Sequence, residues 1–295
     1  MTTTVGPMEA ELAAQQAAAG HPTEPIDTSD ERFNELSQQA TETNPSFVQP
    51  DAPMPEDTMV PLPGGYITQS GRLVREIEVR ELTGEDEEAL ARFRSISSTA
   101  LMGEILVRGI VSVGGEKVDK DAIGAMLCGD RDAAMLGVRR VTFGSTINFT
   151  DVVCPSCQKK FNINVGLDEI PMRKLDDPLA RTVTVPLRHG GDAVMRFPTH
   201  TDSLATLEDD TRTAPEQNTV VIARCLESFQ GRGTASIAFE REAIARKLGS
   251  VDREHILDAI GDAQPGPQLQ EVKTNCPVCN FEAPVVIDLV SIFRT

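Results

Sequence analysis

Aromatic residues are scarce in this sequence, and long apolar runs are missing. The 295 residues include no tryptophan, one tyrosine and 4% aromatic residues in all. No stretch approaches the roughly 20 apolar residues that a membrane-spanning helix needs, and the N-terminus has neither the basic start nor the apolar segment of a secretion signal. We therefore expect a soluble chain without a membrane partner. Its six cysteines are too few for a disulfide scaffold.

Basic residues are also in short supply. Lysine and arginine total 28 against 45 acids, which gives a formal net charge of −17. Residues 1–71 contain eleven acids and one arginine, a net charge of −10, and the other 224 residues carry only −7. Because clustered lysine and arginine bind a nucleic-acid backbone, this charge distribution argues against a nucleic-acid partner.

Residues 1–60 have the composition of a flexible acidic arm. They contain seven prolines and almost no sustained apolar pattern, so they bury too little surface to offset the entropy of ordering. Within them, Thr28 and Glu31 have the spacing of a capping box, and Phe33 and Leu36 fall on one face of the helical pattern that follows. Two interpretations stand: the arm docks on a neighbouring chain through Phe33 and Leu36, or it is a solvated tail.

The next segment has the patterns of a mixed α and β domain. Alternation over residues 72–82 predicts a strand with Leu73, Arg75, Ile77 and Val79 on one side. Thr83 is the expected N-cap of a helix with an acidic first turn. Further helices are predicted over residues 99–110, 121–127 and 131–141, the last with Asp130 as its cap. Cys128 and Cys225 each lie alone on an apolar stripe, which favours a buried structural thiol over a reactive one.

Two Cys-Pro-X-Cys motifs are the strongest chemical signal. In Cys154-Pro-Ser-Cys157 and Cys276-Pro-Val-Cys279, two residues separate the thiols, the spacing that lets one turn place both sulfurs about 2.3 Å from a Zn²⁺ ion. Strand-like patterns flank each pair, over residues 146–153, 160–165, 272–274 and 284–287. The sequence therefore predicts two zinc-ribbon knuckles that share one structural Zn²⁺ per chain.

A dithiol redox site is the rival interpretation, because CPxC also resembles thioredoxin-like sites. Those sites place the first thiol at a helix N-terminus to lower its pKa, and neither pair here precedes a helical pattern. Structural zinc is therefore favoured, with redox chemistry and a chance spacing as the alternatives. Because 118 residues separate Cys157 from Cys276, the second knuckle must return across an inserted domain.

The insertion between the knuckles reads as a hairpin followed by helices. Strand patterns at 181–187 and 193–197 flank the turn from His189 to Asp192, and helical patterns follow over residues 203–207, 216–229, 240–248 and 252–260, the last ending at Gly261. The predicted fold class is α+β, with zinc-ribbon-like β-hairpins joined to small helical domains. The expected divisions are the arm at 1–60, a domain with the first knuckle at 61–175, the insertion at 176–265 and the second knuckle at 266–295.

No catalytic constellation stands out. The four histidines are scattered, with His21 in the arm, His189 in a hairpin turn, His200 in a loop and His255 on an exposed helix face. HExxH, GxSxG and phosphate-binding glycine-rich motifs are missing from the sequence. A closed four-cysteine site also leaves no coordination position for a substrate, so we expect a protein without enzymatic activity.

Three segments resemble one family of phage proteins. Residues 62–90 (LPGGYITQSGRLVREIEVRELTGEDEEAL), 127–157 and 275–294 (NCPVCNFEAPVVIDLVSIFR) are similar to the baseplate-hub and hub-assembly proteins of T4-type contractile-tailed bacteriophages. That family shares the order of strand, acidic helix, Gly-Asp-Arg helix, first knuckle, insertion and second knuckle. Gln158 and Asn280 stand where the family often has glycine, which predicts a left-handed backbone at two residues that are not glycine.

The resemblance implies a non-enzymatic protein at the tail tip. It would be built into the baseplate hub or would escort hub assembly, with other baseplate and tail proteins as partners, in the virion or in the host cytoplasm during assembly. One alternative is a cellular zinc-ribbon adaptor of a nucleic-acid-processing complex, for which Lys159, Lys160 and Arg173-Lys174 are the nearest approach to a basic face. The second alternative is a CxxC dithiol redox protein.

Overall fold

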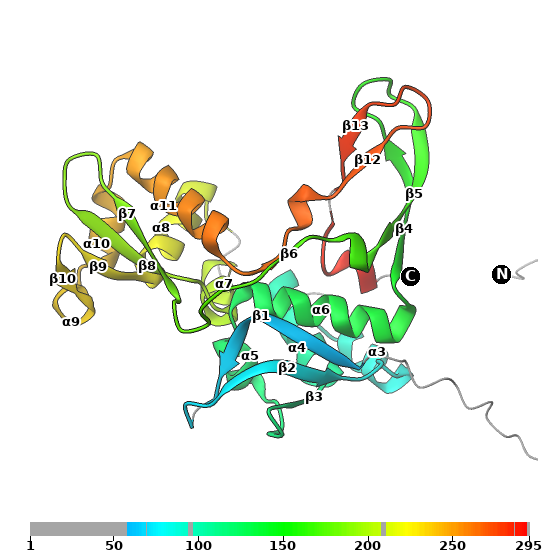
Figure 1. The fold of residues 1–295 in the computed structure, drawn as a ribbon, viewed down its shortest axis with the longest axis horizontal. Helices are drawn as coiled ribbons and strands as arrows, with labels where there is room; N and C mark the ends of the chain where they lie inside the picture. The colour runs from blue at the N-terminus through cyan, green and yellow to red at the C-terminus, as the bar shows by residue number, and fades with distance from the viewer. Residues whose placement is uncertain (1–57, 69, 94–96, 208–210, 286, 294–295) are drawn as a thin grey trace, which may run out of the picture. The chain divides into compact units, whose positions relative to one another are not determined.

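A computed structural model of the chain describes residues 58–68, 70–93, 97–207, 211–285 and 287–293. These residues belong to one compact unit that begins at Pro55. Small sheets and short helices alternate along the unit, so the fold is α+β, as predicted (Figure 1). The arm predicted at 1–60, with Phe33 and Leu36, lies outside the described residues except for its last three positions. Two of those, Met59 and Val60, already belong to the first strand.

Strands β1 (Met59–Ile67), β2 (Leu73–Val79) and β3 (Ile110–Val113) form an antiparallel sheet in the order β1-β2-β3. The register of β1 against β2 shifts between Pro61 and Tyr66. Across this irregularity the buried positions of β2 change sides, so that Val74 is buried and Arg75 is exposed. The predicted alternation, which placed Arg75 with Ile77 and Val79, was therefore wrong at the start of the strand.

Four helices follow the first two strands, namely α3 (Gly84–Ala91), α4 (Ser98–Gly109), α5 (Lys120–Ala125) and α6 (Cys128–Phe143). Thr83 is the N-cap of α3, as predicted, and its backbone N–H donates to the Asp86 carboxylate at 2.9 Å. Asp130 is not the cap of α6, because that helix begins two residues earlier. Its buried carboxylate instead accepts the backbone N–H of Gly64 at 2.7 Å, which joins α6 to β1.

Helix α6 runs through the middle of the larger hydrophobic core. Gly137 allows β1 to approach closely, since a Cβ there would lie 2.3 Å from Val60 Cγ2. This core combines residues between Val60 and Ile170 with residues from Val272 to Ile292. The last part of the described chain therefore completes a core that begins with its first strand.

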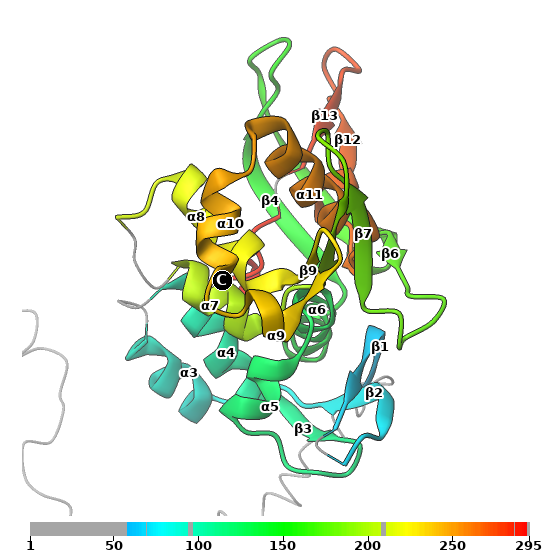
Figure 2. The ribbon, with the colours of Figure 1, turned by 90° about the vertical axis from the view of Figure 1, so that its left-hand side faces the viewer.

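Two hairpins carry the cysteine motifs. Strands β4 (Thr146–Val153) and β5 (Lys160–Gly166) pair with each other, as do β12 (Lys273–Asn275) and β13 (Glu282–Pro284). The two hairpins lie side by side in both views (Figures 1 and 2). Short pieces of structure connect them to the rest of the chain: η1 (Leu167–Glu169), β6 (Met172–Arg173), which pairs with β11 (Gly266–Pro267), η2 (Leu269–Glu271) and η3 (Ser291–Phe293).

The insertion has its own four-stranded sheet, in the order β10-β9-β8-β7, and its own hydrophobic core. Figure 2 shows helices α8, α10 and α11 beside these strands. The strands are β7 (Thr182–Pro186), β8 (Asp192–Arg196), β9 (Leu226–Phe229) and β10 (Arg232–Gly233). The helices are α7 (His200–Leu207), α8 (Ala214–Cys225), α9 (Thr234–Ile237), α10 (Arg241–Lys247) and α11 (Ser250–Ala263).

Two helix ends in the insertion differ from the prediction. The helix predicted over 216–229 ends at Cys225, because Leu226–Phe229 pairs with the second edge of β8 instead. The helix predicted to end at Gly261 continues to Ala263. Gly261 does not adopt the left-handed backbone of a helix-ending glycine. Pro265 disfavours the helical conformation at the preceding residue, Gln264, which is the C-cap of the helix.

Candidate metal centre

The two cysteine motifs have the same backbone geometry. In the first, the Cys154 N–H donates to the Lys159 carbonyl at 3.0 Å, and the Gln158 N–H donates to the Cys154 carbonyl at 2.9 Å. In the second, the Cys276 N–H donates to Phe281 at 2.9 Å, and the Asn280 N–H donates to Cys276 at 2.8 Å. Each motif is thus a tight turn between two strands, and no helix follows either one, unlike a thioredoxin-type site.

The residue after each motif adopts the left-handed backbone that the sequence predicts. Gln158 has a φ of 59° and Asn280 a φ of 56°. Asparagine tolerates this conformation more readily than glutamine. At the first turn, the Gln158 side-chain amide donates to the Pro155 carbonyl at 3.1 Å, so the side chain adds a local contact to the turn.

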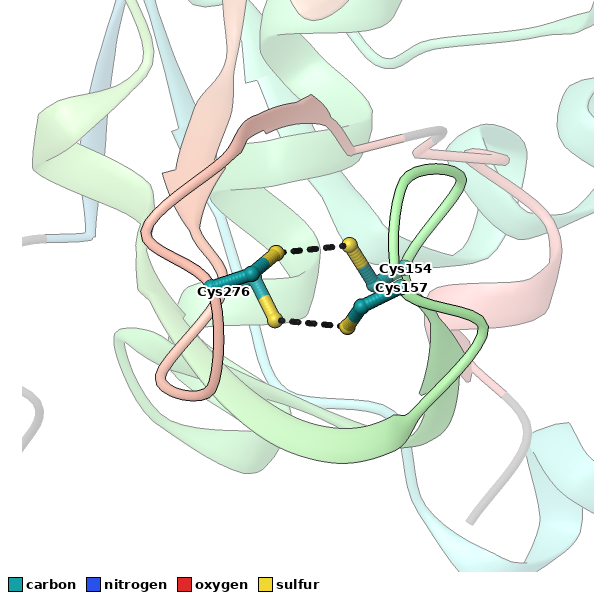
Figure 3. Close-up of side chains that lie close together, drawn as sticks. Cys154, Cys157 and Cys276 are labelled. Carbon is teal, nitrogen blue, oxygen red and sulfur yellow. Dashed lines mark hydrogen bonds between the residues drawn. The ribbon is translucent and has the colours of Figure 1, made fainter.

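The structure brings the four sulfur atoms together. Cys154 Sγ lies 3.6 Å from Cys279 Sγ, and Cys157 Sγ lies 3.7 Å from Cys276 Sγ (Figure 3). All four sulfurs lie within 4.8 Å of one another. Sulfurs placed about 2.3 Å from a tetrahedral ion are separated by about 3.8 Å, whereas a disulfide requires about 2.05 Å. The spacing therefore fits four thiolates around one metal ion.

Burial and ionisation differ within the cluster. Cys154 and Cys276 are buried, Cys157 is half-buried and Cys279 is exposed. Burial opposes ionisation of Cys276, but the backbone N–H groups of Cys279 and Val278 and the neighbouring sulfurs lower its pKa to about 7. The Lys159 N–H favours the Cys157 thiolate, yet burial and the other three sulfurs raise the pKa of Cys157 to about 11. The opposite pKa shifts of Cys157 and Cys276 suit a bound cation, because metal binding requires cysteine ligands in their thiolate form.

Arg139 in α6 contacts the backbone near the start of the β4–β5 hairpin. The sequence patterns did not predict this role. Its guanidinium donates to three backbone carbonyls, those of Ile292 at 2.9 Å, Gly144 at 2.9 Å and Thr146 at 3.2 Å. The side chain therefore joins the start of β4 to the end of the described chain. An arginine on a helix that is otherwise largely buried was the one available signal, but its partners lie too far along the sequence to be inferred.

The other two cysteines are buried thiols, as predicted. Burial raises the pKa of both Cys128 and Cys225 to about 12. The Cys128 thiol donates to the Thr199 carbonyl at 3.2 Å. Neither belongs to the four-sulfur cluster, whose members are the side chains among the described residues that could together hold a metal ion.

The histidines remain separate from the cysteine cluster. The sequence predicted His200 in a loop, and this prediction was wrong. His200 is a buried residue at the start of α7. Burial and the nearby Arg131 lower its pKa to about 4. His189 lies in the turn between β7 and β8, His255 is exposed on α11, and His21 lies outside the described residues.

The family described as T4 bacteriophage base plate protein matches residues 54–294, so the chain belongs to that family. The searches of curated proteins and of solved structures gave no match. In the part of the chain that the structure describes, no helix has the length and apolar character required to span a membrane.

Proposed function

We propose that this protein is a non-enzymatic structural or assembly component of the baseplate hub of a contractile-tailed bacteriophage. Membership of the T4 base plate family is the observation that carries the proposal, and it favours a structural role over catalysis. It also favours a phage component over a cellular zinc-ribbon adaptor. The partners are other baseplate and tail proteins, and the protein acts in the virion or in the host cytoplasm during assembly.

Quantitative mass spectrometry tests the place of the protein. Peptides of this chain are counted against the major capsid protein in purified particles and in lysate from infected cells. A small fixed copy number per particle supports a hub component. Abundance in the lysate together with absence from particles supports an assembly factor. Chemical cross-linking within purified particles adds a second test. Cross-links from this chain only to proteins outside the tail tip would contradict the hub assignment.

One Zn²⁺ per chain, held by Cys154, Cys157, Cys276 and Cys279, is the second part of the proposal. The support is the tetrahedral spacing of the sulfurs and the matched geometry of the two turns. With all four positions occupied by protein, such an ion has no site for a substrate and acts as a staple. Because the unfolded chain lacks the site, the binding energy contributes directly to folding.

Elemental analysis of purified protein tests the metal. We expect about one zinc per chain, and its loss in Cys157→Ser and Cys279→Ser. Cys128→Ser is the matched control. Because the Cys128 thiol is buried outside the cluster, this variant should retain the zinc. Metal-free protein with redox-active cysteines would instead favour the dithiol alternative.

The acidic arm is the proposed docking element, with Phe33 and Leu36 as its apolar anchors. Its net charge of −10 and its short amphipathic pattern support this role. Phe33→Ser with Leu36→Ser should reduce incorporation into particles, while the control Ala17→Ser with Ala18→Ser should not. Equal incorporation of both variants would favour a solvated tail.

We also propose the division into an arm (1–60), a domain with the first knuckle (61–175), an insertion (176–265) and the second knuckle (266–295). The support is the pair of separate hydrophobic cores, one of which lies wholly inside the insertion. Residues 176–265 expressed alone should fold, and a chain with a short linker in their place should retain the metal. An insertion that is unfolded by itself would contradict this division.

A further inference from the structure

The four cysteines form two pairs across the hairpins. Each pair combines one buried cysteine with one that is more exposed. Cys154, which is buried, faces Cys279, which is exposed, at 3.6 Å. Cys276, which is buried, faces the half-buried Cys157 at 3.7 Å. Each pair therefore joins a buried cysteine of one hairpin to a more exposed cysteine of the other, and Figure 3 shows the two contacts between the hairpins.

We propose that these two pairs are an oxidation site, at which two disulfides, Cys154–Cys279 and Cys157–Cys276, replace the metal once the protein leaves a reducing environment. This inference rests on the proposed function for its setting. The host cytoplasm keeps thiols reduced, whereas disulfides persist on virion surfaces outside the cell. A metal staple suits the first condition and a covalent staple the second.

The geometry allows both disulfides to form with small movements. A sulfur pair must close from 3.6 or 3.7 Å to about 2.05 Å once an ion no longer separates the atoms. The sulfurs lie in short turns at the tips of two-stranded hairpins, and both pairs close along the same direction, between the hairpins. Two other pairings of four cysteines exist. Pairing within each motif would leave the two hairpins unconnected, and the other pairing across the hairpins joins Cys154 to Cys276 and Cys157 to Cys279.

The chemistry balances with hydrogen peroxide as the oxidant. Peroxide oxidises the accessible Cys279 thiolate to a sulfenic acid, and Cys154 attacks that sulfur to form the disulfide with loss of water. Cys157 and Cys276 react in the same way. In total, four zinc-bound thiolates, two peroxide molecules and four protons give two disulfides, one free Zn²⁺ and four water molecules.

The chain contains its own negative controls. Cys128 and Cys225 are buried, and burial holds the pKa of each thiol near 12, so they have little thiolate to react. Oxidation that is directed by the cluster should leave both of them reduced. Oxidation that follows general unfolding should modify all six cysteines.

The test uses the full-length, reduced, zinc-loaded protein titrated with hydrogen peroxide. Zinc release is followed with a chromogenic chelator, free thiols are counted, and disulfides are mapped by peptide mass spectrometry. We expect one zinc released and four thiols lost for every two peroxide molecules, with the two cross-hairpin disulfides formed. Disulfides within the motifs, or disulfides that join Cys154 to Cys276 and Cys157 to Cys279, would overturn the inference. Oxidation of Cys128 or Cys225, or retention of all thiols, would also overturn it.

A variant in which one of the four cysteines is replaced isolates the pair that remains. Cys279→Ser removes one pair and should still form Cys157–Cys276, whereas Cys157→Ser should still form Cys154–Cys279. A Cys154–Cys157 disulfide in Cys279→Ser would overturn the assigned pairing. Failure of the proposed function is read separately: lack of zinc in the reduced protein contradicts the metal staple, while disulfide mapping of the same metal-free protein still tests the pairs.

Discussion

Replacing Gly129 with alanine should destabilise the protein, because α6 touches the returning chain at this residue. A Cβ at Gly129 would lie 1.6 Å from the Pro265 carbonyl oxygen and 2.8 Å from Gly266 Cα. Both neighbours are backbone atoms, so no side-chain rotation relieves the overlap. Overpacking costs about 1–3 kcal/mol when side chains can adjust, and we expect the upper end of that range here.

The measurement is equilibrium urea unfolding in the presence of zinc, with a matched glycine as control. Gly129→Ala should lower the free energy of unfolding by about 3 kcal/mol. Gly261→Ala changes a helical glycine whose added Cβ meets nothing within 4 Å, so it should raise the free energy by about 0.5–1 kcal/mol. If the two variants unfold at the same urea concentration, the close contact of α6 with residues 265–266 is refuted.

The same substitution should also weaken metal binding. Pro265 and Gly266 lead through β11 to the second knuckle, so displacement of this segment moves Cys276 and Cys279 away from the first pair. Competition with a chelator should show faster loss of zinc from Gly129→Ala than from Gly261→Ala. Equal rates would mean that the second knuckle is positioned independently of this contact.

Three further results are expected. Zinc chelation under reducing conditions should expose residues 272–293 to protease first, since these residues combine the second knuckle with the segment that completes the core; uniform cleavage would argue against a staple. Arg139→Ala should lower the free energy of unfolding in urea by about 2–4 kcal/mol, because it leaves backbone carbonyls without their charged donor. The control Arg246→Ala removes an exposed ion pair and should lower it by less than about 1 kcal/mol. His200 has a folded pKa of about 4, below its ordinary 6.5, so its contribution to stability is fully present above pH 6.5 and is lost as the pH falls toward 4. His200→Gln should flatten this part of the stability profile measured by thermal unfolding, and an unchanged slope would contradict the assignment.

Local patterns predicted the elements whose causes are local. The N-cap at Thr83 depends on residues one turn away, and the hairpin of β7 and β8 depends on a turn rich in glycine. The left-handed residues Gln158 and Asn280 follow from the turn that the Cys-Pro-X-Cys motif requires. For the cysteines, the residue spacing was enough to predict two knuckles, and the structure places their sulfurs together.

Contacts between distant segments account for the errors. Leu226–Phe229 matches a helical pattern, yet it is a strand because β8 offers an unpaired edge. Asp130 matches a cap, yet it binds Gly64 because α6 begins earlier and packs on β1. The role of Arg139 was not visible, since its acceptor at Ile292 lies 153 residues away.

By itself, the sequence predicted the α+β class of fold, showed the acidic character of the first 60 residues, and indicated the two Cys-Pro-X-Cys turns as a candidate metal site. These properties depend on composition and on residues within a few positions of one another. Only the tertiary structure decided which sulfurs face each other, which of them are accessible, and how α6 and Arg139 bring the second knuckle back to the first. Those features depend on side-chain contacts between residues more than 100 positions apart, which leave no periodic trace in the sequence.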